Sequence, residues 1–97
     1  MAHRYEPKYT WKRTQIDERD PPTDYDWQGF DGLSYIGRIR KEIGGSTNGK
    51  WHWAGSYPRT HMGRPPAWNA GHCDTAREAT QKVEEYWNRC LEVMTPR

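Results

Sequence analysis

Hydrophobic residues recur with a helical period near the C-terminal end of the chain. They return every three or four positions and form one stripe, which consists of Ala76, Ala79, Val83, Tyr86, Trp87, Cys90, Leu91 and Met94. Such a stripe is typical of an amphipathic helix that packs against a core. Thr75 and Glu78 have the spacing of a capping box just before it, and Pro96 marks its end. The pattern predicts a helix that begins at Ala76, with its charged residues, including Glu84, on the outer face.

The central part of the chain alternates with the period of a strand. From Leu33 to Ile43 the residues expected on the core face are Leu33, Tyr35, Gly37, Ile39 and Ile43, with Ile36 as an exception. The preceding Asp31-Gly32 predicts a hairpin, because a type I′ turn requires positive φ at both central residues. The stretch 50–57 alternates in the same way and places Trp51 and Trp53 on one face, with His52 on the other.

These elements predict an α+β fold: a three- or four-stranded antiparallel sheet with one C-terminal α-helix packed on one face. We expect residues 25–94 to form this single sheet-plus-helix domain, with a last short strand near 67–71. Residues 1–24 form a polar, turn-rich N-terminal segment. We expect this segment to be partly disordered, although residues 9–16 can form an edge strand.

The tryptophan pair Trp51 and Trp53 has two interpretations, a half of the core or a flat aromatic platform for a ligand. The first half of the helical stripe is small, because it consists of Ala76, Ala79 and Val83. Small helix residues leave room for large residues on the facing sheet, and Tyr35 and the tryptophan pair can fill that room. The core interpretation is therefore favoured.

Composition and charge narrow the choice of partner. The 97 residues suffice for one domain, and six Trp and six Tyr predict an aromatic core. The net charge is only +2, but residues 33–66 carry six Lys or Arg against one Glu. If the tryptophan pair faces the helix, a basic sheet face lies opposite. The candidate nucleic-acid-binding residues on this face and in the loop that follows are Arg38, Arg40, Lys50, His52, Arg59 and Arg64.

A solvated outer sheet face gives the same charge pattern, so a second interpretation stays open. In it, the chain is a protein–protein interaction or self-association module that uses exposed aromatic residues. The candidates for such a contact are Trp11, Trp27 and Trp68. The sequence does not determine an oligomeric state.

Other function classes receive less support. His52, His61, His72 and Cys73 lie in one third of the chain, but no pair has the spacing of a zinc site. There is no nucleophile elbow and no phosphate-binding glycine loop, so we expect neither an enzyme nor a cofactor. Cys73 precedes the helix start, where a thiolate is favoured.

The two cysteines and the lengths of the apolar runs indicate where in the cell the protein is expected. A continuous helix separates Cys73 from Cys90 too widely for a disulfide, so we expect free thiols and a cytoplasmic protein. No apolar run is long enough to span a membrane.

Two resemblances follow from these motifs. Gly37-Arg38-Ile39, Trp51-His52-Trp53 and the helix start at 75–79 are similar to a group of small uncharacterised bacterial proteins of the sheet-plus-helix type. More distantly, the stretches 35–40 and 71–79 resemble the ethylene-response-factor DNA-binding domain, whose plan phage integrase arm-binding domains share. In that family three antiparallel strands lie in the major groove with a helix behind them. The resemblance implies DNA contacts by Arg38, Arg40 and one of the two tryptophans.

Overall fold

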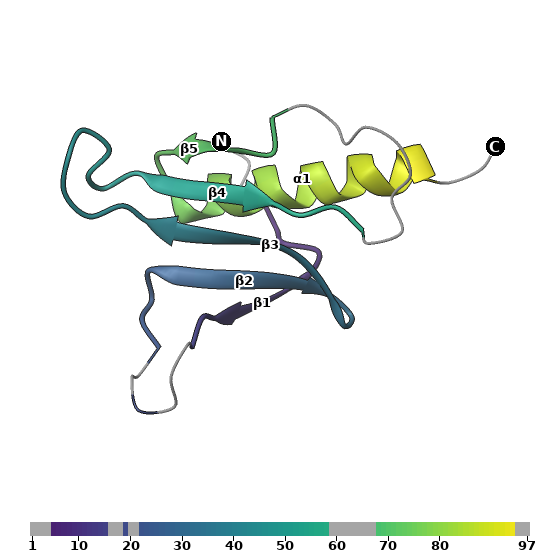
Figure 1. The fold of residues 1–97 in the computed structure, drawn as a ribbon, viewed down its shortest axis with the longest axis horizontal. Coiled ribbons are helices and arrows are strands. Elements are labelled where there is room, and N and C mark those ends of the chain that lie inside the picture. Colours follow the sequence, from purple (N-terminus) through teal and green to yellow (C-terminus); the bar gives the residue numbers. More distant parts are fainter. Residues whose placement is uncertain (1–4, 16–18, 20–21, 59–67, 95–97) are drawn as a thin grey trace.

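The computed structural model describes residues 5–15, 19, 22–58 and 68–94. Within them the chain folds as an α+β domain with one antiparallel sheet and one C-terminal helix. The elements follow in the order β1 (Thr10–Arg13), β2 (Asp26–Asp31), β3 (Ser34–Lys41), β4 (Trp51–Gly55), β5 (Ala70–Cys73) and α1 (Ala76–Met94). The helix lies along one face of the sheet (Figure 1).

The sheet is a simple meander in which every strand pairs with its neighbour in the sequence, in the order β1-β2-β3-β4-β5. It has five strands, whereas the sequence predicts three or four. The two outermost strands, β1 and β5, are each only four residues long. The additional strand is β1, which forms within the stretch 9–16 that the sequence offers only as a possible edge strand. The strand near 67–71 begins instead at Ala70.

The β2–β3 hairpin lies where the Asp31-Gly32 signal places it, but its turn is shifted by one residue. Asp31 pairs with Ser34 as the last pair of the ladder, so the two turn residues are Gly32 and Leu33. Gly32 has a φ of +62°, whereas Leu33 is not among the residues with positive φ. A turn with positive φ only at its first central residue is of type II′ rather than I′. Leu33 consequently projects fully into solvent.

A register shift in β3 changes which side chains reach the core. Gly29 pairs with Gly37 whereas Phe30 pairs with Tyr35, so Ile36 is an extra residue in the ladder. A bulge of this kind reverses the facing of the residues on one side of it. Ile36 is therefore fully buried, and Tyr35 lies on the opposite face with 41% of its surface exposed. The prediction of Tyr35 as a core residue is wrong for this reason.

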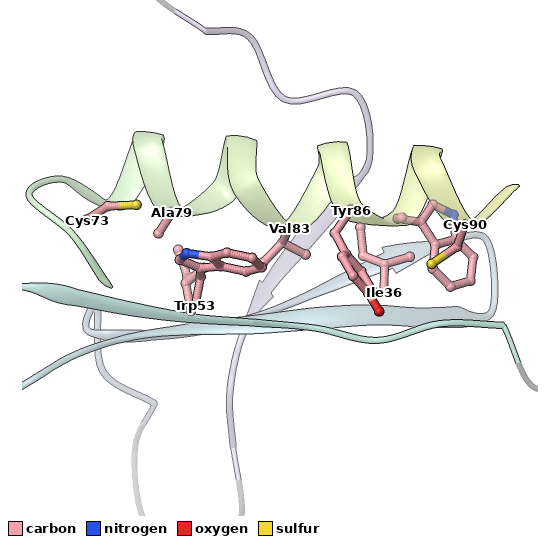
Figure 2. Close-up of a cluster of buried hydrophobic side chains, with 9 residues drawn as sticks. Ile36, Trp53, Cys73, Ala79, Val83, Tyr86 and Cys90 are labelled. Carbon is pink, nitrogen blue, oxygen red and sulfur yellow. The ribbon is translucent and has the colours of Figure 1, made fainter. Parts of the chain in front are cut away.

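The core interpretation of the tryptophan pair is confirmed. Trp53 is 8% exposed and Trp51 is half-buried against the same cluster. In Figure 2 the indole of Trp53 lies between the sheet and the helix, beside Ala79 and Val83. The small residues of the first helical turns provide its space. The remaining buried hydrophobic residues of this core are Ile36, Ile39, Cys73, Tyr86, Trp87 and Cys90.

The helix begins as the capping box predicts. The Thr75 hydroxyl accepts a hydrogen bond of 3.1 Å from the backbone amide of Glu78, which satisfies one of the free amides of the first turn. The same hydroxyl donates to the Glu78 carboxylate, at 3.1 Å. In the standard capping box the Glu carboxylate accepts a hydrogen bond from the backbone amide of the cap residue, whereas here it accepts one from the hydroxyl. The cap fixes the helix directly after β5.

Three glycines lie in register across β2, β3 and β4 on the helix side of the sheet. Gly29 pairs with Gly37, and Gly37 pairs with Gly55. A Cβ atom on Gly55 would lie 2.7 Å from the Tyr86 ring, and one on Gly29 would lie 2.9 Å from both Ile36 and Trp11. Because these positions lack side chains, the helix and the neighbouring rings approach the sheet backbone closely.

Both cysteines are free and buried. Burial is the largest effect on the Cys73 thiol and raises its pKa, and the nearby Glu78 raises it further. The expectation of a favoured thiolate at Cys73 is therefore wrong, because burial of the thiol dominates over its position before the helix. Among the described residues, no helix is both long and apolar enough to cross a membrane.

Candidate nucleic-acid interface

The sheet face opposite α1, here called the open face, has no helix over it in the described part of the chain. Strand alternation places on it the residues of each strand that do not point at the core. Those that bear charge, a ring or an amide are Lys12, Asp26, Gln28, Phe30, Tyr35, Arg38, Arg40, His52 and His72. The open face thus combines cationic, aromatic and imidazole side chains from all five strands.

Arg38 forms an ion pair with Asp26 within the protein. Its guanidinium donates to both carboxylate oxygens of Asp26, with Nε to Oδ1 at 2.7 Å and Nη2 to Oδ2 at 2.5 Å. Thr14 donates to the same carboxylate at 2.8 Å. Burial acts to raise the pKa of Asp26, but the hydrogen bonds from Arg38 and Thr14 outweigh it and leave this pKa below its ordinary value. The fork of Arg38 therefore holds a carboxylate and is not free to bind a phosphate.

Arg40 is the exposed guanidinium of the open face. Its side chain forms no salt bridge or hydrogen bond to the other residues that the structure describes. It lies on β3 between Asp26 of β2 and His52 of β4, and its charge helps to lower the pKa of Asp26. Lys12 is the second exposed cation, and its Nζ lies 5.7 Å from the centre of the Phe30 ring. These two side chains are available to an anionic ligand. The sequence alone suggests Arg40 as a ligand-binding residue, but it does not suggest Lys12.

An imidazole pair lies next to Arg40. His52 and His72 are directly opposed on β4 and β5, and their ring centres are 5.1 Å apart. His72 also approaches Glu42, with Nε2 and Oε1 separated by 3.4 Å. Burial lowers the pKa of His52, and the neighbouring His72 and Arg40 lower it further. His52 is therefore mostly neutral at pH 7 and can donate or accept a hydrogen bond.

Phe30 and Tyr35 form an aromatic pair at the end of the open face near the β2–β3 turn. Their ring centres are 6.1 Å apart and their planes meet at 63°, an edge-to-face arrangement. Sequence analysis missed this pair, because alternation without the bulge places Tyr35 in the core. The Asp31-Gly32 signal indicates a hairpin here, but a turn centred on those two residues would set Phe30 opposite Leu33, and only the observed register sets it opposite Tyr35.

The other candidate cations do not join this cluster in the described structure. Lys50 precedes β4 and forms a 2.6 Å ion pair with Asp74, between β5 and the helix. Arg59 and Arg64 lie outside the described residues. Of the six residues that the sequence suggests, the structure therefore brings together Arg38, Arg40 and His52. The described residues contain no group of three His, Cys, Asp or Glu side chains that could hold a metal ion.

On the helix side of the sheet, Glu84 is a fully buried carboxylate that the sequence places on the outer face. It accepts hydrogen bonds from the Tyr5 hydroxyl, from the amides of Lys8 at 2.9 Å and Tyr9 at 3.2 Å, and from the Trp11 indole at 2.9 Å. Burial, followed by the hydrogen bond to Glu84, raises the pKa of Tyr5. Glu84 therefore fastens the N-terminal segment and β1 to the helix.

A groove of about 580 Å³ lies between this N-terminal segment, β2 and the start of α1. Its lining residues are Pro7, Tyr9, Trp11, Trp27, Ile39, Ala76, Arg77 and Thr80. Trp11 and Trp27, which the sequence suggests as exposed residues, are half-buried here, whereas Trp68 is 87% exposed. The two half-buried rings each donate a hydrogen bond of 2.9 Å, Trp11 to Glu84 and Trp27 to the Asp24 carbonyl.

Comparison with known proteins gives no relative from which a role could be transferred. No protein-family model, curated protein or solved structure matches the chain. The two resemblances suggested by the sequence motifs therefore stay predictions.

Proposed function

We propose that this protein is a small, non-enzymatic nucleic-acid-binding module that uses its open face. The observation that carries the proposal is the placement of exposed Arg40 and Lys12 on the same face as a histidine pair and an aromatic pair. Cations interleaved with rings and hydrogen-bonding groups are the chemistry that contacts phosphates and bases.

We propose a non-enzymatic role, and the burial of both thiols supports this part of the proposal. Cys73 and Cys90 are both buried, and burial raises the pKa of each thiol. A protonated, inaccessible thiol is unreactive. The same free thiols suit a reducing compartment, which supports our proposal of a cytoplasmic location.

Replacing Arg40 with alanine is expected to weaken binding of a labelled oligonucleotide about fivefold at 50 mM salt, because one phosphate contact of about 1 kcal/mol is lost. The measurement is fluorescence anisotropy against a mixed-sequence oligonucleotide. Arg89→Ala is the matched control, since Arg89 is an exposed arginine on α1, away from the open face. Equal affinities of the two variants, or no binding by the unaltered protein, would contradict the proposal.

A second candidate function is a protein–protein or self-association module, and the exposure of Trp68 favours it. Trp68 is 87% exposed and has a φ of +61°, a conformation that bulky residues rarely adopt. If this ring is a contact in self-association, the mass measured by light scattering rises with concentration and Trp68→Ser abolishes the rise. A monomeric mass throughout the series would exclude self-association.

A further inference from the structure

We propose that the open face binds single-stranded rather than duplex nucleic acid, with bases stacked on Tyr35 and Phe30. This inference rests on the proposed function and specifies its ligand. Three features support it: the width of the sheet, the exposed aromatic pair and the small number of free cations.

The width of the sheet disfavours the major groove. Five strands spaced about 4.8 Å apart give a face about 19 Å across from first to last. The major groove of B-form DNA is about 12 Å wide and accepts a helix or a narrow ribbon. Arg40 lies on β3, the central strand, with two strands on either side of it. To bring this guanidinium to a base edge, the whole sheet would have to enter the groove. A single strand can instead lie across a broad surface.

The aromatic pair supplies a surface on which bases can stack. Tyr35 is 41% exposed because the bulge at Ile36 turns it away from the core. Phe30 on β2 stands edge-to-face with it at 6.1 Å. The bases of a duplex are already stacked on one another, so only an unpaired base can occupy such a ring.

The small number of free positive charges on the open face also favours a ligand that binds through its bases as well as its phosphates. Two arginines lie there, but Arg38 is held by Asp26. On this face Arg40 and Lys12 are the cations that form no ion pair with the described residues. Glu42 adds a negative charge beside His72. Duplex-binding proteins commonly contact about 6–10 phosphates. Two cations cannot provide such binding alone, so stacking has to contribute much of the affinity.

The two free cations lie on one side of the aromatic pair, away from the β2–β3 turn. Lys12 of β1 reaches over the Phe30 ring, and Tyr35 follows on β3. Arg40 lies further along β3, beside His52 on β4. A strand that crosses from Lys12 over the two rings and then turns along β3 would meet a cation, two rings, a second cation at Arg40 and the neighbouring imidazole of His52. The paired Asp26 and Arg38 lie between them as fixed hydrogen-bonding groups.

The test compares four fluorescent ligands of equal length with the full-length protein: single-stranded DNA, single-stranded RNA, the DNA duplex, and a strand in which abasic sites replace the central bases. We expect the DNA or RNA strand to bind at least tenfold more tightly than the duplex. We expect the abasic strand, which keeps every phosphate, to lose about tenfold or more. Log affinity should fall with log salt with a slope of about −1.4, the value for two phosphate contacts on a single strand.

Tyr35→Ala is expected to weaken binding of the single strand about tenfold, whereas Tyr35→Phe keeps the affinity within about twofold. Tyr25→Ala is the matched control, because Tyr25 is 51% exposed and lies at the start of β2 against Lys41, off the open face. The abasic comparison uses the unaltered protein and so does not depend on the folding of any variant.

The outcomes separate the two proposals. Stronger binding of either single strand, lost on the abasic ligand, supports single-strand stacking and identifies the preferred sugar. Binding of the duplex equal to or tighter than the single strands, or full affinity for the abasic strand, overturns the stacking inference and leaves the nucleic-acid function standing. No binding of any ligand at 20 mM salt overturns both.

Discussion

Replacing Gly37 with alanine is expected to lower the free energy of unfolding by about 3 kcal/mol or more. A Cβ atom at this position would lie 2.5 Å from the Ala54 carbonyl oxygen and 2.6 Å from Cγ1 of Val83. The first of these atoms belongs to the backbone of β4, so it cannot turn away. Gly37 also has a φ of +151°, a backbone conformation that residues other than glycine rarely adopt. Urea unfolding followed by tryptophan fluorescence measures the loss.

Gly45→Ala is the matched control for this prediction. Gly45 has a φ of +73° but nothing within 4 Å of a Cβ atom, so its substitution tests the backbone conformation without the clash. We expect that variant to lose about 1 kcal/mol. If Gly37→Ala and Gly45→Ala are equally destabilised, the close approach of β4 and the helix to Gly37 is not the cause.

Replacing Glu84 with alanine is expected to cost about 3 kcal/mol or more and to release the N-terminal segment from the helix. The carboxylate is fully buried and accepts four hydrogen bonds from residues 5–11. Hydrogen bonds to a charged acceptor contribute about 1.5–3 kcal/mol each, and buried donors left without an acceptor lose more. Glu84→Gln retains one acceptor oxygen and the shape, so we expect a smaller loss.

Hydrogen exchange locates this effect. In Glu84→Ala the amides of Lys8, Tyr9 and β1 should exchange much faster, while those of β3 and β4 keep their protection relative to global unfolding. Glu85→Ala is the matched control, because Glu85 is the next residue, is exposed, and accepts a hydrogen bond from Gln81 on the same helix. Unchanged exchange in β1 of the Glu84 variant would show that other contacts hold the segment.

The anchoring by Glu84 links the two faces of the sheet. Trp11, whose indole donates to Glu84, points to the helix side, and the next residue, Lys12, points to the open face beside Phe30. Strand alternation couples the two orientations. The buried carboxylate therefore positions one of the two free cations on which the proposed ligand site depends.

The amino-acid sequence alone determines the elements that depend on local patterns. The spacing of the helical stripe and the Thr75 cap predict α1, and the Asp31-Gly32 signal predicts the hairpin. The small residues Ala79 and Val83 predict that Trp53 is in the core. These predictions succeed because periodicity and capping involve residues within a few positions of one another.

Only the tertiary structure decides the features that make the candidate site. The bulge at Ile36 moves Tyr35 to the open face. This bulge depends on the pairing register of β2 and β3, which the sequence of neither strand specifies by itself. Asp26 forms an ion pair with Arg38, 12 positions further along the chain. Residues 5–11 bury Glu84, which lies more than 70 positions away from them in the sequence. A charged residue looks the same in the sequence whether it is free, paired or buried. Which of these states it has depends on the partner that the fold brings to it, and the carboxylate opposite Arg40, Asp26, is hydrogen-bonded to Arg38 instead.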